Sequence, residues 1–213
     1  MRTPAVCAFA LQRGFPSGWT TRHISLALLL VLSCSLFSFV MAGPLQSVSY
    51  VEDKRVGEYE LKAVYLYNFL QFVYWPEPVR AQAKDGVMTI GIVGSSPFGT
   101  ALDELKKSIR ENGMKPVRIV QYGPYADDMN LTSCNLLFVG PSEKRNFHKI
   151  IASLKNAPVL TVGDTENFIA AGGMINLVQD KGKIRWIINR APVEKAGLRL
   201  SSQILGIALR VVD

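Results

Sequence analysis

The sequence predicts an α/β fold: a single-domain layered sandwich with a mostly parallel sheet, helices on both faces and an antiparallel hairpin near the C-terminus. Short apolar, β-rich runs alternate with segments whose apolar residues recur every three or four positions, which is typical of a parallel sheet covered by helices. Two strand-like runs, 174–178 and 183–188, are separated by a Gln-Asp-Lys-Gly turn signal, which predicts the hairpin. The 213 residues are 48% hydrophobic and 19% charged, which favours one globular domain.

The first 42 residues have the features of an export signal. Three arginines and no acid precede residue 24, residues 24–40 carry no charge, and a small-residue cleavage site ends at Ala42. We expect a signal peptide over 1–42, a flexible tail over 43–56 and the folded domain over 57–213. An inner-membrane anchor is the alternative, because 17 apolar residues are near the lower limit for a membrane span.

The domain is expected to begin with an amphipathic helix from Glu58 to Trp75, because Pro76 ends a segment with helical periodicity. The residues that repeat at this spacing form its predicted buried stripe: Leu61, Val64, Tyr65, Phe69, Phe72 and Val73. The density of aromatic side chains favours a core helix over a ligand-binding one.

The remaining elements follow from the same two periodicities. Apolar or alternating runs predict strands over 87–93, 116–122, 134–139 and 158–162, before the hairpin. Helical spacing predicts helices over 97–112, 143–155, 166–170, 191–197 and 201–212. Ser142 and Asp164 are the expected N-caps of the second and third of these helices.

The loop from Gly94 to Gly99 has the glycine spacing of a phosphate loop. Thr100 stands where that motif needs a lysine, so nucleotide hydrolysis is excluded. The free amides of the following helix can still bind a small anion. The weak candidates for binding a small ligand are Ser95, Ser96, Gly99 and Arg185.

No catalytic constellation is visible in the sequence after the leader, so we expect no enzymatic activity, no cofactor and no metal site. His148 is the only histidine and Cys134 the only cysteine, which excludes the usual zinc ligand sets and an internal disulfide. The apolar strand that follows Cys134 predicts a buried thiol. Cleavage leaves a net charge of +4 (24 − 3 basic against 17 acidic residues), which does not indicate nucleic-acid binding.

Three stretches together resemble the YfiR family of exported bacterial proteins, from about Glu58 to Val212. The stretches are 59–69 closed by Trp75-Pro76, then 90–94 with 97–99, and then 160–164 followed by Phe168, 172–175 and 185–189. The resemblance implies a periplasmic regulator that binds the periplasmic part of an inner-membrane diguanylate cyclase and represses it, lowering cyclic di-GMP and with it biofilm and exopolysaccharide.

The resemblance also implies partners. An OmpA-like outer-membrane lipoprotein can sequester such a repressor, and YfiR-like proteins dimerise, so a homodimer is expected. Better-known members of the family carry additional cysteines that form disulfides. Because Cys134 has no such partner here, redox control by an internal disulfide is not expected in this chain.

Two groups of residues follow from the family motifs and from strand alternation. Motif residues expected to serve the fold are Tyr65, Asn68, Trp75, Gly172, Gly173 and Asn189. Residues expected to contact a partner are Glu166, Phe168, Ile169, Arg185 and Ile187. Core packing is the alternative role for Phe168 and Ile169. The alternative function for the chain is a periplasmic small-ligand-binding protein without catalysis.

Overall fold

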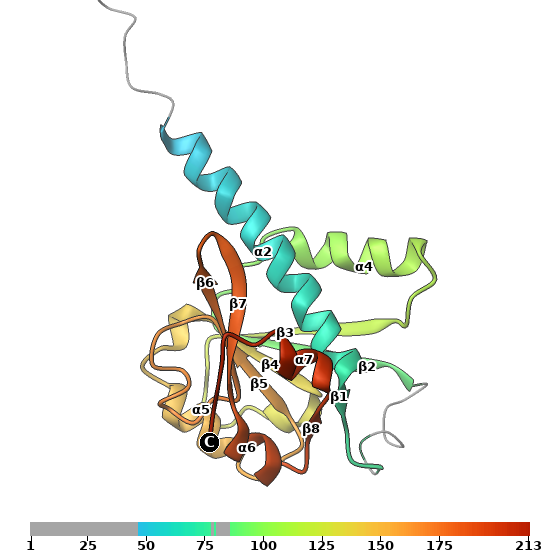
Figure 1. Cartoon of the computed structure of the whole chain (residues 1–213), viewed down its shortest axis with the longest axis vertical. Coiled ribbons are helices and arrows are strands. Elements are labelled where there is room, and N and C mark those ends of the chain that lie inside the picture. The colour runs from blue at the N-terminus through green and yellow to red at the C-terminus, as the bar shows by residue number, and fades with distance from the viewer. Residues whose placement is uncertain (1–46, 78, 80–85) are drawn as a thin grey trace, which may run out of the picture. The chain divides into compact units, whose positions relative to one another are not determined.

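The computed structural model of the chain describes residues 47–77, 79 and 86–213, and Ser49–Asp213 forms one compact unit (Figure 1). The helices are α2 (Ser47–Phe72), α4 (Ala101–Glu111), α5 (Phe147–Ser153), α6 (Arg190–Lys195) and α7 (Ser202–Gly206), with 3-10 turns η2 (Leu131–Ser133) and η3 (Pro141–Glu143). The strands are β1 (Val73–Tyr74), β2 (Met88–Val93), β3 (Val117–Gly123), β4 (Leu136–Val139), β5 (Leu160–Gly163), β6 (Ile175–Asp180), β7 (Lys183–Asn189), β8 (Arg199–Leu200) and β9 (Arg210–Val212).

Within the described residues, seven strands form one sheet in the order β3-β2-β4-β5-β6-β7-β9, and β1 pairs with β8 in a separate two-stranded sheet. Neighbouring strands in the large sheet are parallel except β6 and β7, which form the antiparallel hairpin. The predicted fold class is therefore confirmed. The expectation that the hairpin forms the edge of the sheet is wrong, because β9 pairs with β7 on its outer side and is itself the edge strand.

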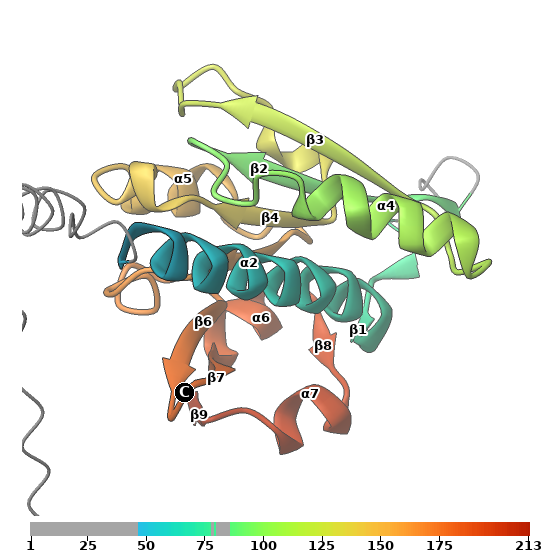
Figure 2. The ribbon, with the colours of Figure 1, turned by 90° about the horizontal axis from the view of Figure 1, so that it is seen from above.

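Strand alternation divides the core into two layers, one on each face of the sheet. In β4, Leu136 and Phe138 pack into the larger layer, whereas Leu137 and Val139 pack into the smaller one. Buried residues of α2, α4, α6 and α7 belong to the larger layer, and those of α5 belong to the smaller. Figure 2 shows α2 running between α4 on one side and the hairpin with α7 on the other.

The predicted stripe of α2 is only partly correct, because Phe69 and Val73 are buried as expected but other buried positions differ. Ala63, Leu66 and Leu70 face the core, whereas Leu61, Val64 and Phe72 are 40%, 42% and 38% exposed. Both sides of this helix are apolar, so the 3.6-residue period identifies a helix without choosing its buried face. The helix also starts at Ser47, so residues 47–56, where we expected a tail, have helical backbone.

Two predicted helix caps are corrected by the structure. Ser142 caps no long helix, because η3 and α5 are separate elements and the Ser142 hydroxyl accepts a hydrogen bond from Ser95 N at 2.9 Å. Asp164 caps no helix either, because residues 165–172 form successive turns and its carboxylate bonds to α2 instead.

The C-terminal segment is not a single amphipathic helix. It forms the short helix α7, whose N-cap Ser201 accepts from Ile204 N, and then strand β9. Gly206 ends α7, and the last residues gain more hydrogen bonds by pairing with β7 than a frayed helix end would give them.

The β6–β7 turn has the chemistry expected of a two-residue hairpin. Lys181 and Gly182 both have positive φ, at 48° and 75°, which matches the backbone of a type I′ turn. The sequence signal at 179–182 is thus confirmed.

In the part of the chain that the structure describes, none of the helices has the length and apolar character needed to cross a membrane.

Candidate functional site

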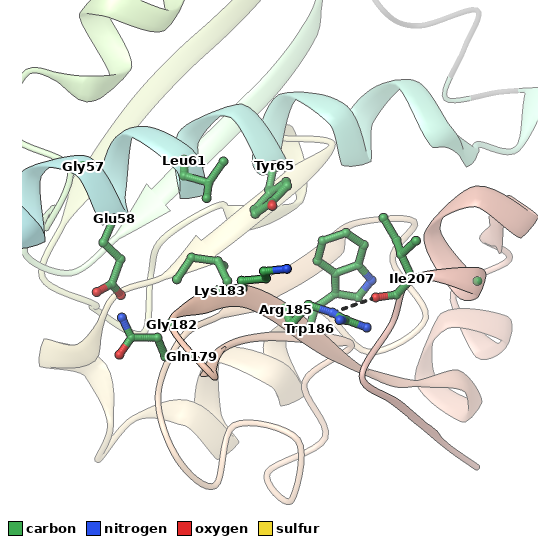
Figure 3. A pocket seen from close by; sticks show the side chains of 12 residues that line it. Gly57, Glu58, Leu61, Tyr65, Gln179, Gly182, Lys183, Arg185, Trp186 and Ile207 are labelled. Atoms are coloured by element: carbon green, nitrogen blue, oxygen red, sulfur yellow. Dashed lines mark hydrogen bonds between the residues drawn. The ribbon is translucent and has the colours of Figure 1, made fainter.

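A groove lies between α2 and the C-terminal hairpin. Its walls are α2, through Leu61 and Tyr65, and the α7 end, through Ile207; its floor is β7, through Trp186 (Figure 3). We call it the α2–β7 groove, and its volume is about 560 Å³. This size lies in the range of sites that bind drug-sized ligands or the anchor residues of a partner.

The floor of the α2–β7 groove is held by aromatic packing. Trp186 meets Tyr65 edge-on at 5.2 Å between ring centroids and Phe69 at 5.3 Å. The indole N–H of Trp186 donates to Ile204 O at 3.1 Å, so its polar atom is satisfied while the ring remains beside the groove. The rigid aromatic floor is suited to receiving apolar side chains.

A second, narrower hollow of about 90 Å³ continues the groove along α2. It shares Tyr65, Trp186 and Ile207 with the first and extends past Asn68 to Phe72. Leu61 and Phe72, one near each end, are both well exposed, as is Ile207 at 56%. Exposed apolar side chains gathered in a hollow mark a surface that binds other molecules.

Charged groups lie on both sides of the α2–β7 groove (Figure 3). Lys183 and Arg185 of β7 contribute two cations, and the Arg185 Nε–H donates to Ile207 O at 3.2 Å. Glu58 of α2 is the carboxylate of the lining, it lies away from Arg185, and it already pairs with Lys62 at 2.6 Å. Among the described residues no ion pair engages Lys183 or Arg185.

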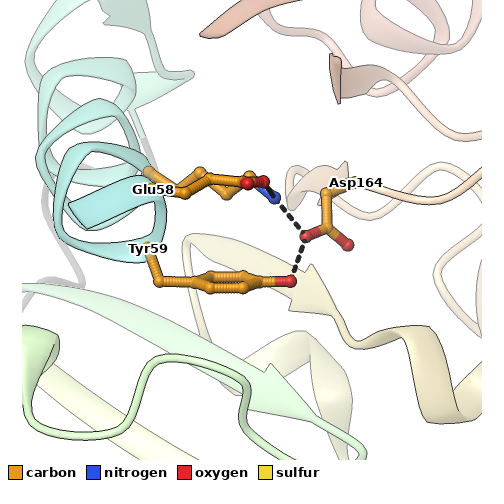
Figure 4. Close-up of polar contacts among 4 residues, drawn as sticks. Glu58, Tyr59 and Asp164 are labelled. Atoms are coloured by element: carbon orange, nitrogen blue, oxygen red, sulfur yellow. Dashed lines mark hydrogen bonds and ion pairs between the residues drawn. The ribbon is translucent and has the colours of Figure 1, made fainter. Parts of the chain in front are cut away.

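A buried ion cluster fixes α2 beside the groove (Figure 4). Lys62 donates to the Asp164 Oδ2 atom at 2.7 Å, and the Tyr59 hydroxyl donates to the same atom at 2.9 Å. The Lys62 ammonium also lies 4.2 Å from the Tyr59 ring centroid. The side chains of Lys62 and Asp164 are 5% and 2% exposed, so the cluster ties α2 to the end of β5 in a low-dielectric setting.

The predicted anion loop is packed against the chain itself. Strand order reverses between β2 and β4, where folds of this class usually bind ligands. Here Ser142 Oγ accepts from Ser95 N, and Gly94 lies against Ser142 and the buried Glu143. Ser96 and Gly99 remain in this loop, and only Arg185 of the four ligand candidates lines the α2–β7 groove.

The predicted partner residues separate into two places. Phe168 is fully buried and packs edge-on against Phe147 at 5.2 Å, so in this structure it has the core role given as its alternative. Glu166 is exposed and Ile169 half-buried in the same turn segment. Arg185 and Ile187 are half-buried on β7, opposite the buried face, as alternation predicts.

The motif residues lie partly in the core, partly at the groove and partly at the end of β7. Trp75 is buried and donates to Leu70 O at 3.3 Å. Gly172 has a φ of 97°, and a Cβ at Gly173 would stand 2.8 Å from Phe168 Cζ and closer still to other ring atoms. Tyr65 and Asn68 are half-buried at the groove, and Asn189 is half-buried at the end of β7.

The thiol of Cys134 is buried and donates to Leu131 O at 3.2 Å. Burial raises its pKa to about 12, so it is a poor nucleophile. His148 is exposed on α5. Among the described residues, no three His, Cys, Asp or Glu side chains are grouped so that they could hold a metal ion.

Sequence reasoning missed most of the groove. Leu61 was assigned to the core, and neither Ile207 nor Lys183 was given a binding role. One sequence feature could have indicated the groove. The apolar residues of α2 cover more of the helix surface than one buried face requires.

The mostly parallel sheet, covered by helices and bordered by an apolar, partly cationic groove, defines a single α/β domain. Residues 59–209 match the YfiR/HmsC-like family, which is most of the chain. The chain belongs to this family.

Two solved structures show a weak likeness to the chain. An ABC domain in complex with L-Trp from Streptococcus pneumonia is 16% identical, with a TM-score of 0.46 over 64% of this chain and 58% of that one. A conserved domain protein from Vibrio cholerae is 15% identical, with a TM-score of 0.44 and the same coverage. This chain thus spans little more than half the length of each.

Proposed function

We propose that the protein is an exported regulator that binds the periplasmic part of a membrane diguanylate cyclase and holds it inactive. The observation that carries this proposal is the family match over residues 59–209. Membership suggests a periplasmic regulator of cyclic di-GMP signalling. A repressor of this kind acts by binding alone, which agrees with a site made of an apolar groove and unpaired cations.

The α2–β7 groove is the surface that we assign to the cyclase. Its aromatic floor is rigid, its walls carry exposed apolar side chains, and α2 is fixed by the Lys62 cluster. Buried aromatic anchors and arginines carry most of the energy of protein interfaces. The releasing lipoprotein and the homodimer, both expected from the family resemblance, belong to this proposal as further binding events.

Intracellular cyclic di-GMP in the source bacterium tests the proposal. Deleting the gene is expected to raise cyclic di-GMP, and the wild-type exported chain is expected to restore the original level. A Leu61→Asp chain, which places a charge in the groove, is expected to restore it poorly. A Lys107→Asp chain, altered on the exposed side of α4, is the matched control. Unchanged cyclic di-GMP after deletion would rule out repression.

A small-ligand-binding role is the second candidate, and the groove volume of about 560 Å³ favours it. A thermal-shift screen with nucleotides and amino acids tests it, because a ligand raises Tm in proportion to the logarithm of its concentration. Substituting Arg185 is expected to abolish such a shift. A screen without any concentration-dependent shift counts against this role.

A further inference from the structure

We infer that the α2–β7 groove takes an amphipathic helix of the partner, with its apolar stripe in the groove and acidic residues against Lys183 and Arg185. The inference rests on the proposed function and specifies the chemistry of the partner surface. It follows from the shape of the groove walls, the hydrogen-bond state of the floor and the charge balance of the lining.

The shape of the groove matches a helix. Leu61, Tyr65 and Phe72 line it or border it from successive turns of α2. From residue 57 to residue 72 the wall is roughly 22 Å long, at about 1.5 Å per residue. Side chains spaced by three and four residues form ridges that interdigitate with those of a second helix.

The floor does not favour an added strand. Strand β7 pairs with β6 over its whole length. Its other edge is occupied by Leu209, whose N–H donates to Trp186 O at 2.8 Å, and by β9 beyond it. Among the described residues, β7 keeps an open edge only near the tip of the hairpin, which is too short for stable strand addition.

The charges favour an acidic occupant. Lys183 and Arg185 have no ion-pair partner among the described residues, whereas Glu58 in the same lining is paired with Lys62. A ligand therefore has to supply the carboxylates. The chain's own first 46 residues contain no aspartate or glutamate, so that segment does not match the groove.

Two synthetic peptides of about 18 residues, roughly five helical turns, test the inference. Both carry the same apolar stripe, and one has two glutamates beside it where the other has two lysines. Each is titrated by calorimetry into the full chain purified in its exported form. The glutamate peptide is expected to bind about tenfold more tightly than the lysine peptide.

Charge reversal provides the decisive comparison. The double variant Lys183→Glu with Arg185→Glu is expected to prefer the lysine peptide. The matched control, Lys107→Glu with Arg110→Glu, makes the same charge change on the exposed side of α4 and is expected to keep the wild-type preference. If the double variant fails to fold, Lys183→Glu alone, at an exposed position, is expected to reduce the preference about threefold.

Several results would overturn the inference. Equal affinity for the two peptides, or reversal by the control variant, removes the role of the two cations. A dimer in sedimentation that Leu61→Asp dissociates assigns the groove to a second copy of the chain instead.

The cyclic di-GMP assay separates this inference from the proposed function. If the deletion raises cyclic di-GMP and the charge-reversed chain still represses fully, the acidic-helix inference fails and the function stands. If the deletion does not change cyclic di-GMP, the proposed repressor function is wrong. The calorimetric titrations alone then decide whether the groove prefers an acidic helix.

Discussion

The two faces of the central sheet are covered to different degrees. On the smaller layer, α5 and the turn segment after β5 close tightly around Phe168, whose ring lies against Gly163 and Gly173. On the larger layer, α2 packs one apolar side on the sheet and leaves the other exposed at Leu61, Val64 and Phe72. The same sheet therefore has one face that is closed by tight packing and one face that keeps the apolar surface for which we propose a binding role.

Removing the buried cation Lys62 is expected to destabilise the larger layer more than any other change considered. Lys62→Met leaves Asp164 with a buried carboxylate that retains only the Tyr59 hydroxyl. We expect a loss of about 4 kcal/mol in the free energy of unfolding, measured by urea denaturation. Lys106→Met is the control, because Lys106 pairs with Asp103 at the same 2.7 Å on the surface. A similar small loss for both variants would contradict the role of the cluster.

The smaller layer is expected to be destabilised most at its tightest contact, between Gly173 and the Phe168 ring. Gly173→Ala places a methyl group inside the space of the Phe168 ring, and Gly163 blocks the ring on the other side. We expect a loss of about 3 kcal/mol by overpacking, read from the same denaturation experiment. Gly57→Ala, where the added methyl meets nothing within 4 Å, should be neutral or slightly stabilising. A neutral Gly173→Ala would show that this face is looser than described.

Alkaline pH tests the closed face without a mutation. Burial raises the pKa of Cys134 from 9.0 to about 12, so the folded chain favours the neutral thiol. The resulting stability is complete below pH 9 and is lost as pH rises from 9 to 12, by about 2 kcal/mol at pH 10.5. Desolvation also raises the pKa of Tyr122, which adds a loss of the same sign above pH 10. Denaturation of Cys134→Ala should show a shallower pH slope; an equal slope would exclude the thiol as its cause.

The smallest expected effect comes from comparing an exposed and a buried position of helix α2. Val64→Ala truncates an exposed side chain of α2 and should change stability by under about 0.5 kcal/mol. Leu66→Ala, two residues further on and fully buried, should cost about 3 kcal/mol. Thermal unfolding of both variants measures the difference. Equal losses would mean that the outer side of α2 is already covered in solution.

Patterns that depend on local sequence predicted the fold well. The apolar run after Cys134 is buried on both faces because β4 lies inside the sheet, and the turn at Lys181-Gly182 requires residues that accept positive φ. Long-range contacts were not predictable in this way. The Lys62–Asp164 contact joins residues 102 apart in the chain, and nothing near Asp164 distinguishes a buried ion partner from a helix cap.

The candidate site was harder to predict than the fold for a related reason. Arg185 was identified, but the groove needs α2, β7 and Ile207 together, and only the packing of the C-terminal segment brings them to one place. That segment looked like one helix because its apolar spacing fits α7 and ignores the later pairing of β9 with β7. Tertiary hydrogen bonding overrode the local pattern.

In an oxidising compartment, the Cys134 thiol is protected from reaction once the chain has folded around it. The rate of folding therefore decides how long this thiol stays reactive. With a pKa of about 12, the folded chain exposes roughly one thiolate per 10⁵ molecules at pH 7. If the chain is exported as we propose, enzymes that form disulfides meet Cys134 as a reactive thiol mainly before the chain has folded. Mixed disulfides at Cys134 would then report how long newly exported molecules wait before they fold.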